Sequence, residues 1–115
     1  MDSLGGADLV IVAAACGCLN PEHASGPDRE TVSVNVIGFM ALAQAAFRLF
    51  QARGHGHLAA ITSIAALQGS SDGTAYAASK AFQNRYTWMV CERRRNSLKC
   101  RLPLPNCNRV LWTRR

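Results

Sequence analysis

The sequence lacks the features that mark a membrane-spanning or a secreted protein. Its 115 residues contain no apolar run that approaches the roughly 20 residues of a membrane span. Asp2 and Asp8 precede the first long apolar stretch and no basic residue does, which argues against a secretory signal. We therefore expect a cytoplasmic protein that does not engage a membrane, with its five cysteines present as thiols.

Motifs that hold zinc are also missing. Cys91, Cys100 and Cys107 are separated by eight and six residues and have no histidine near them, so no close ligand pair is available. The chain also lacks internal repeats and low-complexity tracts, and 49% of its residues are apolar. This composition indicates one globular, metal-free domain that is long enough to bury a core.

Positive charge is concentrated at one end of the chain. Residues 1–87 carry five basic and six acidic side chains, whereas residues 88–115 carry eight basic side chains and one acidic side chain. We therefore divide the chain into a body, residues 1–87, and an irregular basic tail, residues 88–115, in which residues 97–102 are a candidate short strand. The tail leaves nucleic-acid association open as a function. It is the least favoured one, because no recognisable nucleic-acid-binding module accompanies the charge.

The body predicts alternating strands and helices. Residues 7–15 and 57–63 are short apolar runs typical of parallel strands that are buried on both faces. Between them, we expect a helix over residues 28–53 that Asp28 caps and Gly54 ends. Its apolar face repeats at three- and four-residue spacing and comprises Val32, Val36, Phe39, Ala43, Ala46 and Phe50. A second helix over residues 74–87 follows. This order predicts an α/β fold with a parallel sheet and crossover helices.

A candidate catalytic set lies at one edge of this sheet. Ser63 ends the second strand, and ligands of open α/β sheets bind beyond the carboxyl ends of the strands. Tyr76 and Lys80 are four residues apart on the helix that follows, so they share a face that is otherwise rich in alanine. A free phenol has a pKa of about 10, and a neighbouring ammonium favours its ionised form. The pair is therefore suited to exchanging a proton with a substrate oxygen, which the Ser63 hydroxyl would also contact.

These residues resemble the active-site segment of the short-chain dehydrogenases/reductases. The segment "ITSIAALQGSSDGTAYAASKA", residues 61–81, has the strand-end serine followed by Tyr-x-x-x-Lys. "VNVIGF", residues 34–39, is similar to the helix segment that bears the family's catalytic asparagine, and "DLVIVAAACG", residues 8–17, occupies the place of the strand ending in Asn-Ala-Gly. The resemblance covers about residues 7–87 and implies a fragment of a Rossmann-like, doubly wound parallel sheet.

The resemblance also implies a function and a set of site residues. It implies an NAD- or NADP-dependent oxidoreductase acting on a small-molecule carbonyl or alcohol, without distinguishing the two cofactors. The implied catalytic residues are Asn35, Ser63, Tyr76 and Lys80, and the implied cofactor contacts are Ala13, Ala14, Tyr76 and Lys80. In the family, the lysine binds the nicotinamide ribose and the asparagine holds a water that relays protons to the lysine. These roles for Lys80 and Asn35 are expectations from the resemblance.

Three departures from the family pattern qualify the expected activity. Ala13 and Ala15 stand where the family has asparagine and glycine, and no glycine-rich strand–turn–helix is found. No Pro-Gly turn follows the second helix. A non-catalytic fragment that associates through its two helices is therefore the alternative function. We expect self-association in either case, through apolar side chains left without cover: Val32, Val36, Phe39, Phe47, Phe50, Phe82 and Tyr86.

Overall fold

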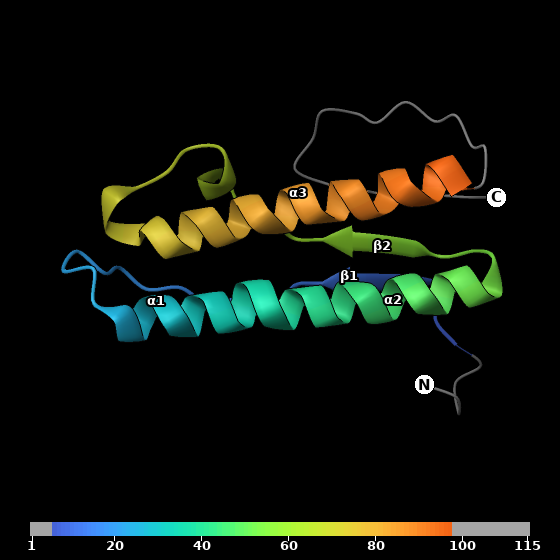
Figure 1. Ribbon diagram of the computed structural model, residues 1–115, viewed down its shortest axis with the longest axis horizontal. Helices are drawn as coiled ribbons and strands as arrows, with labels where there is room; N and C mark the ends of the chain where they lie inside the picture. The colour runs from blue at the N-terminus through green and yellow to red at the C-terminus, as the bar shows by residue number, and fades with distance from the viewer. Residues whose placement is uncertain (1–5, 98–115) are drawn as a thin grey trace.

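Two parallel strands and two long helical stretches form the part of the chain that this computed structural model describes, residues 6–97 (Figure 1). Strand β1 (Leu9–Val12) is followed by α1 (Ser25–Val32), a π-helical turn η2 (Ser33–Gly38) and α2 (Phe39–Arg53). Strand β2 (His57–Ala60), two 3₁₀ turns, η3 (Ile64–Ala66) and η4 (Ser71–Gly73), and helix α3 (Thr74–Ser97) complete the order. The predicted strand–helix–strand–helix order is confirmed.

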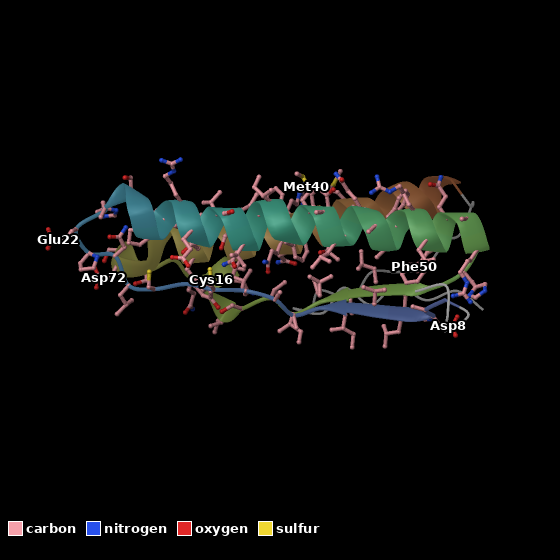
Figure 2. The ribbon with its side chains drawn as sticks, turned by 90° about the horizontal axis from the view of Figure 1, so that it is seen from below. Asp8, Cys16, Glu22, Met40, Phe50 and Asp72 are labelled. Carbon is pink, nitrogen blue, oxygen red and sulfur yellow. The ribbon has the colours of Figure 1, made fainter. Side chains whose placement is uncertain are left out.

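The helices cover one face of the sheet. Strand β1 pairs with β2 in parallel, from Leu9 opposite His57 to Val12 opposite Ala60. Both helical stretches lie on the same side of the two strands (Figure 2). On the other side, Leu9 and Ile11 remain 51% and 55% exposed. The expectation of strands buried on both faces is therefore wrong for the described residues, because no described element covers the second face.

Both strands are shorter than predicted. The amide of Ile61 donates the last ladder hydrogen bond, to the carbonyl of Val12 at 3.0 Å. The carbonyl of Ile61 then turns to a side chain of α3, Lys80, and leaves the ladder. Ser63 consequently lies three residues beyond the end of β2, where it is the N-cap of η3. The paired part of the sheet therefore ends at this hydrogen bond.

The start of the first long helix was predicted wrongly, and its end correctly. Ala24, not Asp28, is the N-cap of α1, and it makes no side-chain capping bond. The buried Asn20 side chain holds this end instead, since it accepts a hydrogen bond from the Ala24 amide and donates to the Ala24 carbonyl and the Asp28 carboxylate. At the other end, Gly54 adopts φ 78° and stops α2 in the expected left-handed conformation.

Part of the predicted apolar face forms the core. Val32, by contrast, is 41% exposed, although the predicted repeat placed it on the buried face. The π-helical turn η2 inserts an additional residue per turn, so it rotates the preceding helical face away from the sheet. The buried apolar core comprises Val12, Phe39, Ala43, Ala46, Phe50, Leu58 and Ala60. Phe50 points toward the strands (Figure 2).

The turn between α2 and β2 depends on a second glycine. Gly56 has φ 140°, and a Cβ at this position would meet the Phe50 ring at 2.0 Å.

By length and composition alone, the continuous helical stretch Ser25–Arg53 could cross a membrane. The core helix of a soluble protein passes the same test, and here Phe39 and Phe50 of this stretch are packed in the core formed with the strands.

Helix α3 runs ten residues past its predicted end. It continues through the expected boundary at residue 88, where Thr87 is fully buried and Val90 packs against the core. The ring of Tyr86 makes an edge contact with Phe39 at 6.2 Å between centroids. The division into a body and a tail stays a prediction. The candidate strand at 97–102 begins at the helix end and otherwise lies outside the described residues.

Candidate functional site

The loops that follow the two strands meet at the carboxyl edge of the sheet. Ala13 and Ala14 come directly after β1 and are exposed. Ser63 follows β2, and its short helix η3 packs against α3. Cys16 lies at this end of the molecule, whereas Asp8 lies at the opposite end of β1 (Figure 2). The predicted cofactor contacts Ala13 and Ala14 thus lie at the same edge as the predicted catalytic residues, with side chains too small to obstruct a ligand.

Tyr76 and Lys80 form the centre of the site. They occupy the first turns of α3, one turn apart, and the Lys80 ammonium lies 5.9 Å from the centroid of the Tyr76 ring. The phenol is half-buried, whereas the lysine is only 3% exposed. A charged group is therefore held within cation–π distance of a ring that remains accessible.

Lys80 is held by two neutral oxygen atoms. Its ammonium donates to the Ile61 carbonyl at 3.1 Å and to the Gln83 amide oxygen at 3.0 Å. Burial removes the ammonium from water and lowers the pKa of Lys80 from its usual 10.5. An ammonium has three N–H donors, and these two bonds leave one for a ligand or for Tyr76.

Asn35 is buried beneath the site and is held by hydrogen bonds. Its side chain is fully buried and pairs with the backbone of Cys16, accepting from the amide at 2.8 Å and donating to the carbonyl at 2.6 Å. It also donates to the Ser79 hydroxyl at 2.9 Å. Within residues 6–97, this side chain therefore fixes the loop after β1 against α3. The backbone carbonyl of Asn35 accepts a hydrogen bond from the side-chain amide nitrogen of Gln83 at 2.9 Å. The side chain of Gln83 therefore links Lys80 to the Asn35 carbonyl, and the expected water relay between Lys80 and Asn35 stays a prediction.

Ser63 lies at the start of η3, the short helix that packs against α3. Its hydroxyl oxygen accepts from the Ala65 amide at 3.2 Å, which caps η3. Among the described residues it makes no hydrogen bond to Tyr76. Because the hydroxyl acts there as an acceptor, its own O–H can still be donated to a substrate oxygen.

Two residues of the site were missed by the sequence reasoning. Gln83 is three positions after Lys80 on the same helix face, a spacing that could have revealed it. Gly17 packs against the Tyr76 ring: a Cβ at this position would lie 2.3 Å from Cδ2 and 2.8 Å from Cγ of Tyr76. Only a glycine in the loop after β1 allows the ring its present position, and no sequence pattern signals that contact.

Comparisons with known proteins agree with this arrangement. The sequence profile described as short chain dehydrogenase matches residues 1–96. An uncharacterized oxidoreductase of Mycobacterium tuberculosis is 36% identical over 84 residues, which amount to 70% of this chain and 33% of that protein. The chain therefore spans about a third of the length of this curated relative.

Solved structures share the fold. The NADPH-dependent 3-quinuclidinone reductase from Rhodotorula rubra has a TM-score of 0.74 and 29% identity, over 83% of this chain and 38% of the reductase. A 7α-hydroxysteroid dehydrogenase, complexed with NADH and 7-oxo-glycochenodeoxycholic acid, has a TM-score of 0.68 and 27% identity, over 80% of this chain and 38% of the dehydrogenase. These likenesses confirm the predicted fragment of a Rossmann-like parallel sheet.

Proposed function

This chain belongs to the short chain dehydrogenase family, and we propose that it carries the proton-transfer site of a nicotinamide-dependent oxidoreductase acting on a carbonyl/alcohol pair. One observation above all supports this proposal. The buried Lys80 ammonium lies 5.9 Å from the centroid of the Tyr76 ring, on the same helix face. Its two hydrogen bonds use two of its three N–H groups and leave the third for a ligand.

The residues at the sheet edge fit a nicotinamide cofactor in part. Ala13 and Ala14 are exposed and have no side chain beyond Cβ, so a flat ring could approach the loop after β1. The unused N–H of Lys80 is suited to a ribose hydroxyl. A bound nicotinamide would supply or accept the hydride. The three side chains Tyr76, Lys80 and Ser63 would do the remaining chemistry.

Each of these side chains has a distinct role in the proposal. In the direction of reduction, Tyr76 donates its hydroxyl proton to the carbonyl oxygen as that oxygen gains negative charge. The Ser63 O–H donates a hydrogen bond to the same oxygen and orients the substrate. The positive charge of Lys80 stabilises the phenolate that Tyr76 leaves behind. In oxidation, the same groups accept the proton and act in reverse.

A chimera tests this proposal. Residues 7–87 would replace the matching segment of the Rhodotorula rubra reductase, and reduction of 3-quinuclidinone would be followed by the loss of NADPH absorbance. Tyr76→Phe should lower turnover by about 100-fold or more, because it removes a general acid. Tyr86→Phe is the matched control: Tyr86 packs against Phe82 and Phe39 in the core, and its replacement should leave turnover within about threefold. Equal turnover of the two variants would contradict the proposal.

We also propose self-association, through a set of residues that matches the expected one only in part: of the expected residues, Val32 is exposed. Phe39 and Phe50 are buried in the chain's own core, so they cannot form an interface. Other large apolar side chains remain exposed on the helices and on the open face of the sheet. They include Leu9, Ile11, Val34, Ile37, Leu42 and Ile61. These two faces are the candidates for contact with a second copy.

A further inference from the structure

Gln83 is a buried amide whose two ends are both bound. The residue is 1% exposed, and it is one of the largest fully buried side chains in the described part of the chain. Its oxygen accepts from Lys80 and its nitrogen donates to the carbonyl of Asn35. No other orientation of the amide satisfies both neighbours, because an ammonium only donates and a carbonyl only accepts.

The buried ammonium that Gln83 contacts has no counter-ion among the residues that the structure describes. Arg53 and His55 pair with Asp8, at the opposite end of β1. The titratable side chain that the structure shows facing Lys80 is Tyr76, on the same helix. Within residues 6–90 no carboxylate pairs with this charge, and the amide oxygen of Gln83 and the backbone carbonyl of Ile61 are its hydrogen-bond acceptors.

We propose that Gln83 is a positioning residue of this site, which holds the Lys80 ammonium beside Tyr76 by bridging it to the Asn35 carbonyl. This role of Gln83 in catalysis rests on the proposed function. A lysine side chain has four rotatable carbons and extends toward water when nothing holds it. The bridge ties the ammonium to η2, where the Asn35 carbonyl is available for a side chain of α3.

The bridge also limits where protons can travel. A carboxamide holds its neighbours by hydrogen bonds, but it is neither acidic nor basic near neutral pH and does not pass a proton between them. No proton therefore passes from Lys80 to Asn35 through the Gln83 side chain itself.

The protonation of Lys80 can be measured directly in the full chain. Lys80 and Lys99 are the two lysines of the sequence, so a Lys99→Arg protein labelled with ¹³C-lysine gives a single lysine Cε signal. In this background, Gln83→Leu should lower the measured pKa of Lys80 by about one to two units, since a hydrogen bond to the charged form is lost. Gln83→Glu should raise it, because a carboxylate replaces the amide oxygen.

Thr87→Val is the matched control for these variants. The Thr87 hydroxyl is fully buried one turn further along α3 and donates to the backbone carbonyl of Gln83, without contacting Lys80. This control should leave the pKa of Lys80 unchanged. A pKa unaffected by Gln83→Leu, or lowered as much by Thr87→Val, would overturn the proposal.

A measurement without any change at residue 83 covers the case in which Gln83→Leu does not fold. In the Lys99→Arg chain, the ¹⁵N signals of the Gln83 side-chain amide should shift with pH at the midpoint of the Lys80 titration. A Gln83 amide signal whose ¹⁵N shift does not change at this midpoint would refute the bridge. Neither measurement uses turnover. A failure of the proposed function therefore leaves these results in place, and their failure leaves the chimera assay in place.

Discussion

Replacing Gly17 by alanine tests the packing of the Tyr76 ring most sharply. A Cβ at residue 17 would lie 2.3 Å from Cδ2 of Tyr76, whereas carbon atoms in ordinary contact are about 3.5–4.0 Å apart. The backbone of Gly17 is not in the left-handed region, so alanine is tolerated by the main chain itself. The whole cost must therefore come from the ring, which has to move by roughly an ångström or more.

The size of this cost follows from the burial of Tyr76. Overpacking a rigid core costs about 1–3 kcal/mol. Tyr76 is half-buried and close to the start of α3, so its ring can swing outward, and we expect the lower part of that range, about 1–2 kcal/mol. For a chain of this size, each kcal/mol lowers the melting temperature by roughly 4–8 °C.

Thermal unfolding followed by circular dichroism measures this cost in a double-mutant cycle. Gly17→Ala should destabilise the chain, but it should cost almost nothing in a Tyr76→Ala background, where no ring remains to collide with the new methyl group. Gly73→Ala is the matched control, because nothing lies within 4 Å of a Cβ there, and it should be neutral or stabilising by about 0.4–1 kcal/mol. An equal loss in both backgrounds, or no loss at all, would refute the placement of Tyr76 against Gly17.

Three further predictions concern charge, cofactor and association. Because burial lowers the pKa of Lys80 in the folded chain, the unfolded chain binds more protons between that lowered value and 10.5. The free energy of unfolding should therefore rise with pH in this window, and urea unfolding should show a smaller rise for Lys80→Met; identical slopes would contradict it. Titration of the 115-residue chain with NADH and NADPH, followed by fluorescence, should show binding weaker than micromolar, because one free ammonium N–H and two alanines offer few contacts; micromolar affinity would show this wrong. Light scattering should detect oligomers whose mass falls in an Ile37→Glu variant, since Ile37 is 56% exposed on the helical surface; a monodisperse 12.4 kDa species would count against self-association.

The sequence predicted the elements well where local chemistry decides them. The repeat of Phe39, Ala43, Ala46 and Phe50 marks the buried face of α2, and Gly54 marks its end, because both signals act within a few residues. The pairing of Tyr76 with Lys80 on one helix face follows from their spacing in the same way.

Features that depend on long-range contacts could not be predicted. Asn20 replaces Asp28 in holding the start of α1 because a loop folds back on the helix, which no local pattern shows. The π-helical turn likewise shifts Val32 to the surface, and the role of Gln83 depends on the Asn35 carbonyl, 48 residues earlier in the chain. In the sequence alone, a polar residue three positions after a lysine is typical of a solvent-exposed helix face.

The most direct test of the site follows the hydride onto the carbonyl carbon of the substrate and compares the rate of that step with and without the proton donor Tyr76. The chimera that carries residues 7–87 would be supplied with NADPH deuterated at the transferred position and with 3-quinuclidinone. Mass spectrometry of the alcohol should find one deuterium per product molecule, and Tyr76→Phe should form this product about 100-fold more slowly while NADPH affinity stays the same. Deuterated alcohol formed at an undiminished rate by the Tyr76→Phe chimera would contradict the assignment of Tyr76 as the proton donor.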